Sequence, residues 1–142
     1  MCKITFKTKV SNTKKIDMYK ILNNLATYGI GEPGILQSYV DCEIGFIDGF
    51  RIIDVRTLID GDNRLSEYSL NIIRVTSYLQ LGENVVICSR AGVSISNAIA
   101  LGVLINYFKM DFCNAIGLVI SKVCICNILN THTISLQKLF KL

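Results

Sequence analysis

Residues 85–96 read Val-Val-Ile-Cys-Ser-Arg-Ala-Gly-Val-Ser-Ile-Ser, and this stretch decides the fold that we expect for the chain. The apolar run over 85–88 predicts a strand buried on both faces, as parallel strands are. Gly92 predicts a tight loop after the strand, and the apolar residues from position 95 onward predict a helix. A glycine loop between a strand and a helix directs backbone N–H groups toward an anion at the helix N-terminus. The stretch therefore predicts a phosphate-binding loop.

The same stretch resembles the signature of the dual-specificity protein phosphatases, His-Cys-x-x-Gly-x-Ser-Arg-Ser, which often carries Ala-Gly-Val-Ser in its middle. Alignment on the Ala-Gly-Val-Ser segment places Cys88 where the family has its histidine. Ser89 then stands at the position of the nucleophilic cysteine, and Ile95 at the position of the phosphate-binding arginine. The resemblance implies a phosphate loop made of Ser89, Arg90, Ala91, Gly92, Val93, Ser94, Ile95 and Ser96.

A second register takes Cys88 as the nucleophile and places the family's arginine at position 94, which holds a serine. Neither register supplies the arginine, and Arg90 matches a variable position whose side chain usually points outward. The family's reaction needs a thiolate nucleophile and a guanidinium that grips the phosphoryl oxygens. Ser89 has no obvious general base, because the single histidine, His132, is distant in sequence. We therefore predict that the chain is catalytically inactive.

The third catalytic group of the family is a general-acid aspartate upstream of the nucleophile. Asp60 is the best candidate for this role, and Asp62 is the alternative. Both flank Gly61 in a polar loop that leads into a predicted helix. Ordinary turn chemistry around this glycine is the other interpretation, and the sequence leaves both open.

The resemblance to the family extends beyond the loop, over about residues 50–142. Residues 96–108 resemble the family's central helix, and residues 110–115 resemble the opening of its next helix. The resemblance implies a single domain over residues 1–142 with the α/β fold of the cysteine phosphatases, a central and mostly parallel sheet flanked by helices. The alternative is a different α/β domain in which Gly92 makes a plain strand-to-helix turn.

Hydrophobic periodicity predicts a coarse layout of the chain. Strands are expected over residues 4–10, 35–39 and 85–88, with further short strands between 45 and 59. Helices are expected over residues 15–28, 65–81, 95–108, 111–122 and 134–141. In the second of these helices we expect Leu70, Ile73 and Tyr78 to face inward, and Gly82 to end it.

The composition is that of a globular domain, with 51% hydrophobic residues and a net charge of +4. Basic residues gather near the start of the chain, at Lys3, Lys7, Lys9, Lys14, Lys15 and Lys20. A solvated face explains this run better than nucleic-acid binding does, because no aromatic residues are regularly interleaved with it. The frequent use of Ile, Asn and Lys indicates an AT-rich genome, and a large DNA virus is one such source.

Six cysteines in a chain without a visible secretory signal indicate a reducing compartment rather than disulfides. Cys124 and Cys126 lack a partner pair at zinc spacing, so we expect no metal and no other cofactor. The apolar stretch 85–108 is interrupted by Arg90 and several polar residues, so we expect no membrane insertion. Together these features predict a place in the cytoplasm or nucleus, of the host cell if the protein is viral.

The function that we predict is that of a pseudophosphatase, a catalytically dead domain that binds a protein, phosphorylated or not, in signalling. Loss of the guanidinium costs phosphate binding about 2–5 kcal/mol. The alternative is therefore a purely structural interaction or homodimerisation module that binds no phosphate. An active phosphatase for protein or for RNA 5′ phosphates is the third interpretation and the one that the residues support least.

Overall fold

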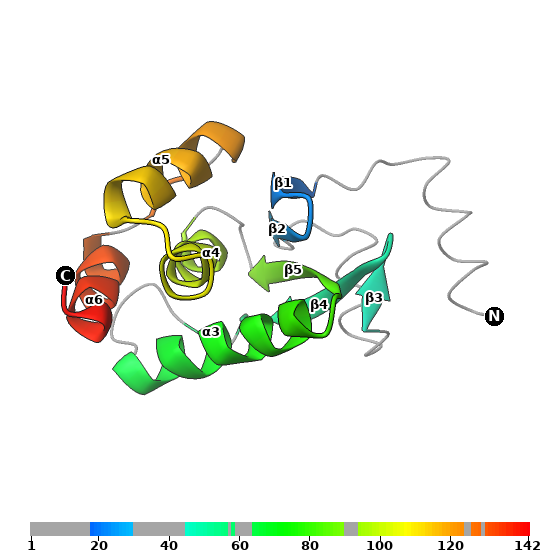
Figure 1. Ribbon diagram of the computed structural model, residues 1–142, viewed down its shortest axis with the longest axis horizontal. Helices are drawn as coiled ribbons and strands as arrows, with labels where there is room; N and C mark the ends of the chain where they lie inside the picture. The colour runs from blue at the N-terminus through cyan, green and yellow to red at the C-terminus, as the bar shows by residue number, and fades with distance from the viewer. Residues whose placement is uncertain are drawn as a thin grey trace.

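The computed structural model describes residues 18–29, 45–56, 58, 64–89, 94–123, 126–128 and 130–142. The strands are β1 (Tyr19–Leu22), β2 (Leu25–Gly29), β3 (Phe46–Ile47), β4 (Phe50–Asp54) and β5 (Asn84–Ser89). The helices are α3 (Leu65–Gln80), α4 (Ile95–Asn106), α5 (Phe112–Lys122) and α6 (Asn130–Phe140). Figure 1 shows α4 almost end-on, with α3, α5 and α6 around it and the strands on the remaining side. The strands predicted over 4–10 and 35–39 lie outside the described residues.

The five strands form one sheet in the order β1-β2-β5-β4-β3. β5 occupies the centre and runs parallel to both neighbours, with Leu25 opposite Val85 on one side and Asp54 opposite Cys88 on the other. Antiparallel pairing joins β1 to β2 and β3 to β4 at the two edges. The predicted buried central strand is confirmed and is one residue longer at each end.

A tight turn joins β3 to β4. Asp48 and Gly49 form it with positive φ angles of 50° and 83°. This is the backbone conformation of the two-residue hairpin turn that Asp-Gly favours. The short strands predicted after position 45 are thus confirmed, and β4 ends at Asp54.

The helix predicted over residues 15–28 is wrong in its described part, because residues 19–29 form the antiparallel hairpin of β1 and β2. The prediction rested on apolar residues at helical spacing, among them Leu25. In the structure Leu25 is fully buried beside β5, and Val85 donates its N–H to the carbonyl of Asn24 at 2.9 Å. Pairing with the central strand therefore overrides the local helical spacing.

The central helix α4 is buried on all sides over Ile95–Leu104. α3 approaches it closely at Gly102, where a Cβ atom would lie 2.4 Å from Cδ1 of Ile72. The three helices predicted after the loop are confirmed, with α6 beginning at Asn130 rather than at 134. In the described part of the chain, no helix combines the length and the apolarity that crossing a bilayer requires.

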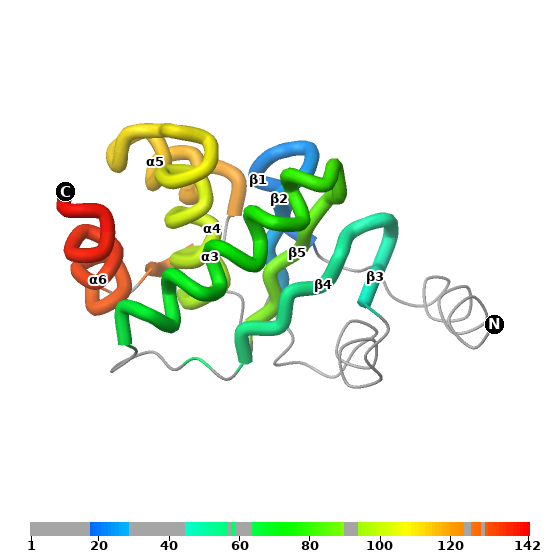
Figure 2. Tube along the Cα trace, turned by 60° about the horizontal axis from the view of Figure 1, so that its bottom comes forward, coloured from blue at the N-terminus to red at the C-terminus, as the bar shows by residue number. Residues whose placement is uncertain are grey.

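Helix α3 packs against β5 and β4, and Figure 2 shows it running diagonally alongside them. It begins and ends close to the predicted positions, and Gly82 follows it with a φ of 82°. The inward direction predicted for Leu70 and Ile73 is wrong, because these side chains are 60% and 55% exposed. Tyr78 is half-buried against the core, as expected. The residues that face the core from α3 are Tyr68, Ile72, Val75 and Leu79.

Candidate functional site

The site predicted from the sequence lies where β5 ends and α4 begins, at the carboxyl end of the parallel strands. Open α/β sheets bind their ligands at this edge. Ser89 is the last residue of β5 and Ile95 is the first of α4, so the predicted loop starts and ends on buried elements. The structure brings Ser89, Ser94, Ile95 and Ser96 to this edge. The other four loop residues, Arg90, Ala91, Gly92 and Val93, lie outside the described residues.

Ser89, at the family's nucleophile position, is buried and its hydroxyl donates to Oγ of Ser96 at 3.0 Å. This hydrogen bond connects the end of β5 to the first turn of α4. Thr27 on β2 makes a second connection, because its hydroxyl donates to Oδ1 of Asn97 at 2.9 Å in the buried interior. The two bonds hold the start of α4 against two neighbouring strands, which fixes the described flanks of the loop.

Ile95, at the family's arginine position, is 6% exposed and belongs to the main hydrophobic cluster of the protein. Its side chain has no hydrogen-bond donors. Neighbouring residues of the same helix, Ala98 and Ile99, belong to the same cluster and are fully buried. The isoleucine therefore serves the packing of the core, and α4 brings no guanidinium to the edge where the loop lies.

Cys88, the nucleophile of the alternative register, is fully buried in β5. Burial raises the pKa of its thiol well above the ordinary value, the charge of Asp54 raises it further, and the charge of Arg56 partly opposes this rise. A thiol with a raised pKa stays protonated at neutral pH, and the thiol is a much weaker nucleophile than the thiolate. Cys88 thus behaves as a small buried side chain rather than as an activated nucleophile.

An ion pair at the end of β4 lies next to this position and was not predicted from the sequence. The guanidinium of Arg56 donates to both carboxylate oxygens of Asp54, from Nε and from Nη2, each at 3.0 Å. Asp54 is the strand partner of Cys88, so the pair flanks the carboxyl end of β5. The signal that reveals it is two polar residues, Asp54 and Arg56, that interrupt an apolar run beside the strand of the loop.

Two further predicted groups do not join the described part of the site. The candidate general acids Asp60 and Asp62 lie outside the described residues. His132 belongs to α6, and its Nδ1 is 2.6 Å from the hydroxyl of Tyr68 on α3; both side chains are fully buried. Within the described ranges, no three His, Cys, Asp or Glu residues come together as a metal site would require.

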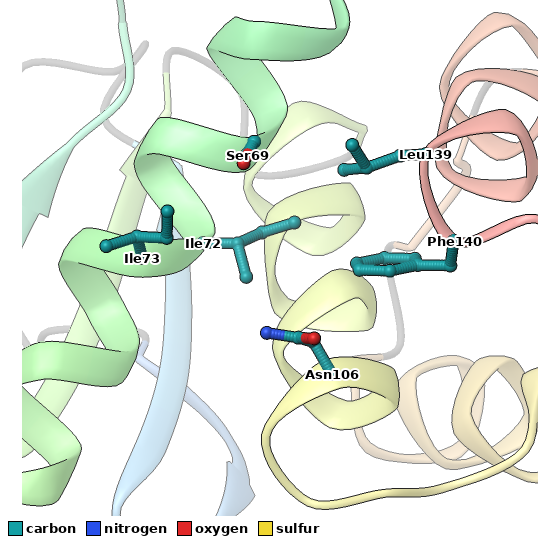
Figure 3. Close-up of a pocket in the computed structure, with 6 residues that line it drawn as sticks. All are labelled: Ser69, Ile72, Ile73, Asn106, Leu139 and Phe140. Atoms are coloured by element: carbon teal, nitrogen blue, oxygen red, sulfur yellow. The ribbon is translucent and has the colours of Figure 1, made fainter.

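A hollow of about 280 Å³ lies between α3, α4 and α6. Figure 3 shows its apolar side chains grouped around Ile72, with a polar amide at its lower side. It is lined by Ser69, Ile72, Ile73, Asn106, Leu139 and Phe140. None of the described residues that line the hollow is charged, and Ser69 and Asn106 make part of its lining polar.

No protein-family model matches the chain, and no curated protein matches its sequence significantly. Solved structures are nevertheless similar to it. A variant of human DUSP28 aligns with a TM-score of 0.72 and 13% identity, over 87% of this chain and 94% of that chain. The human tyrosine phosphatase-like serine/threonine/tyrosine-interacting protein aligns with a TM-score of 0.68 and 16% identity, over 89% and 97%. A mouse protein assigned as a dual-specificity phosphatase, complexed with zinc tungstate, aligns with a TM-score of 0.73 and 12% identity, over 91% and 89%.

The chain therefore has the fold of the dual-specificity phosphatases, a mixed α/β fold whose central five-stranded sheet is flanked by helices. At these identities the likeness shows the fold alone.

Proposed function

We propose that this protein is a pseudophosphatase that binds a phosphorylated protein in a signalling pathway and does not hydrolyse it. The observation that supports this best is the chemistry at the two critical positions of the loop. Ser89 stands at the nucleophile position with its hydroxyl donated to Ser96, and Ile95 at the arginine position packs in the core. Phosphoryl transfer by this fold requires an activated nucleophile and a guanidinium on the transferred group, and neither residue supplies one.

The other candidate groups do not restore these functions. A serine nucleophile needs an adjacent general base. His132 is fully buried and hydrogen-bonded to Tyr68 of α3, where it serves the packing of α3 against α6. Cys88 is buried with a raised thiol pKa. These features support the loss of turnover in both registers of the loop.

Phosphate binding survives in this proposal because it depends on other parts of the fold. The start of α4 lies at the carboxyl edge of the sheet, and a helix N-terminus attracts an anion through its N–H groups and its dipole. The bonds of Ser96 to Ser89 and of Asn97 to Thr27 hold this helix end in place. An anion site that is already ordered binds without a further ordering cost.

The test is a titration of the isotope-labelled full chain, followed by NMR at the amides of Ser89, Ser94, Ile95 and Ser96. The probes are a phosphotyrosine peptide, the same peptide without phosphate, inorganic phosphate and tungstate. We expect saturable shifts at these amides with the phosphorylated peptide and not with the unphosphorylated one. Hydrolysis of an aryl phosphate is expected to be absent, and turnover that disappears in Cys88→Ser would overturn the proposal.

A purely structural interaction module is the second candidate, and one observation favours it. Leu70 and Ile73 are large apolar side chains exposed on α3, and Ile73 lines the hollow described above. Exposed apolar surface of this kind occurs at protein–protein contacts. Under this candidate the loop amides do not move with any phosphate probe, and self-association measured by sedimentation is lost in Ile73→Arg.

The setting of the protein is also part of the proposal. The abundance of Ile, Asn and Lys supports a source with an AT-rich genome, such as a large DNA virus. Among the described residues, Cys88, Cys113 and Cys126 are free thiols, which supports a place in the reducing cytoplasm or nucleus of the host cell. Immunolocalisation of the tagged full chain during infection tests both statements.

A further inference from the structure

The hollow between α3, α4 and α6 is separate from the edge of the sheet where the phosphate site is proposed. Asn106, one of its lining residues, is the last residue of α4, whereas Ile95 at that edge is the first. An α-helix rises about 1.5 Å per residue, so about 16 Å of helix lies between the two residues. A function of the hollow is therefore independent of phosphate binding by the loop.

The lining of the hollow offers apolar side chains that a partner can reach. Ile73 is 55% exposed, and Leu139 and Phe140 are only partly buried against the core. Figure 3 shows Ile72 of α3 pointing toward the two side chains of α6, with Asn106 below them. An apolar pocket with a few polar groups at its margin is the kind of place where one protein anchors a side chain of another.

The exposed charges next to the lining residues are positive. Lys138 and Lys141 precede and follow the two lining residues of α6, and Lys109 comes shortly after the end of α4. All three lysines are exposed, and within the described part of the chain none of them takes part in an ion pair. Neither α4 nor α6 contains an acidic residue.

The acidic residues closest in sequence to this surface are engaged at helix starts. The carboxylate of Glu67 accepts from the backbone N–H of Arg64 at 2.7 Å, at the start of α3. The carboxylate of Asp111 accepts from the backbone N–H of Asn114 at 2.8 Å, at the start of α5. The three lysines therefore give the margin of the hollow an uncompensated positive charge.

This charge decides between a second copy of the chain and a different partner. A two-fold contact between copies sets the same patch against itself, so it would bring the lysines of one copy toward those of the other. Like charges across an interface oppose association, whereas the carboxylates of an acidic partner are complementary to the lysines. The occupant that fits both the apolar lining and the charge is acidic and amphipathic.

We propose that the hollow between α3, α4 and α6 docks an acidic amphipathic helix of a partner protein. The apolar face of that helix contacts Ile73, Leu139 and Phe140, and its Asp and Glu side chains lie near Lys138 and Lys141. Helices that bind in this way present apolar anchors at positions i, i+3, i+4 and i+7. The proposal gives the protein a second interaction surface, which acts whether or not the loop binds phosphate.

The experiment measures binding of three fluorescent peptides to the full chain by anisotropy. The first peptide is a designed helix of about 18 residues, long enough to be helical, with Leu at the anchor positions and Glu and Ala elsewhere. The second carries Lys in place of every Glu, and the third carries Ala in place of every Leu. We expect saturable binding of the first peptide, and binding at least about tenfold weaker of the other two.

Two matched pairs of variants locate the binding. Ile73→Ser is compared with Ile120→Ser, because Ile120 is 56% exposed on α5 and does not line the hollow. We expect the acidic peptide to bind about fivefold or more weakly to Ile73→Ser, and within about twofold of wild type to Ile120→Ser. Lys138→Glu with Lys141→Glu should weaken the acidic peptide and strengthen the basic one. Lys122→Glu, a reversal at the last-turn lysine of α5, should change either affinity by no more than about twofold.

Each other outcome overturns this inference and leaves the pseudophosphatase proposal standing. An acidic peptide that binds no better than the basic one contradicts the predicted charge of the partner. Equal binding to Ile73→Ser and Ile120→Ser shows that the peptide binds elsewhere. Self-association in sedimentation that is lost only in Ile73→Ser makes a second copy the occupant. If the amide spectrum shows that Ile73→Ser does not fold, the lysine reversal decides, since unchanged affinities for both charged peptides there overturn the proposal.

Discussion

Replacing Ile95 with arginine restores the guanidinium that the fold's usual site carries, and the structure predicts that this change destabilises the protein. Ile95 is 6% exposed within the main hydrophobic cluster. Burial of an isoleucine side chain contributes about 1.5–3 kcal/mol to stability. The arginine must also keep its charged end hydrated or hydrogen-bonded, which forces the start of α4 to adjust. We therefore expect Ile95→Arg to lower the free energy of unfolding by about 2–4 kcal/mol.

Thermal unfolding measures this effect. In a domain of this size 1 kcal/mol shifts Tm by about 2–4 °C, so we expect a decrease of roughly 5–15 °C. Ile73→Arg is the matched control, because it makes the same chemical change at a side chain that is 55% exposed. Its Tm is expected to change by no more than about 2 °C. An Ile95→Arg variant as stable as wild type would show that Ile95 does not support the core, and the reasoning about this position would fail.

Phosphate provides a second measurement on the same variants. If the new guanidinium of Ile95→Arg reaches the loop, phosphate at about ten times its Kd restores about 1.4 kcal/mol of stability. Ile73 is exposed on α3 and lines the hollow between α3, α4 and α6, so Ile73→Arg should gain no more from phosphate than wild type does. An equal gain in both variants would mean that phosphate stabilises the protein through its general charge rather than through this site.

Three further predictions concern the packing and the buried polar groups. Gly102→Ala is expected to destabilise the folded protein by about 1–3 kcal/mol, because its Cβ would meet Ile72 at 2.4 Å. Gly117→Ala has open space around its Cβ and should stabilise the protein by about 0.5–1 kcal/mol, so denaturant unfolding of the two variants should give changes of opposite sign. Tyr68→Phe is expected to lower the free energy of unfolding by about 1–3 kcal/mol, because it removes the buried hydrogen bond to His132. A decrease below roughly 0.5 kcal/mol, the size of a surface effect, would show that this hydrogen bond does not stabilise the fold. The raised thiol pKa of Cys88 means that the folded state keeps a proton that the unfolded chain loses at high pH. The free energy of unfolding should therefore fall as the pH rises above about 9, by at most about 1.4 kcal/mol per pH unit. Urea unfolding of Cys88→Ala between pH 7 and 10 should lack this dependence.

The centre of the fold was predictable because the sequence around it carries more than one independent signal. The apolar run before Ser89, the glycine after it and the apolar helix from Ile95 agree on a strand, a loop and a buried helix. The structure has β5 and α4 at these positions, with β5 between two parallel neighbours. The similarity to solved dual-specificity phosphatases then confirms the fold at identities of 12–16%, where periodicity and loop pattern remain readable.

Other features depended on contacts that no local pattern contains. Leu25 fits a helical stripe as well as a strand, and its pairing with Val85 decides for the strand. Both faces of α3 carry apolar residues, so only the packed structure shows that Ile72 faces the core while Ile73 is exposed. The neighbourhood of Arg56 and the loop strand depends on the order of the strands, since Arg56 is far from Ser89 in sequence.

Binding and turnover are separable functions in a site of this kind. Turnover requires groups whose interactions strengthen as charge develops in the transition state, whereas binding requires only that they hold the ground state. Under the proposed function, Ser89 is hydrogen-bonded to Ser96 and Ile95 packs in the core, so neither residue supplies an interaction that strengthens as the phosphoryl group is transferred. The backbone N–H groups at the start of α4 favour an anion in the ground state. We therefore expect a phosphorylated partner to stay phosphorylated while it is bound.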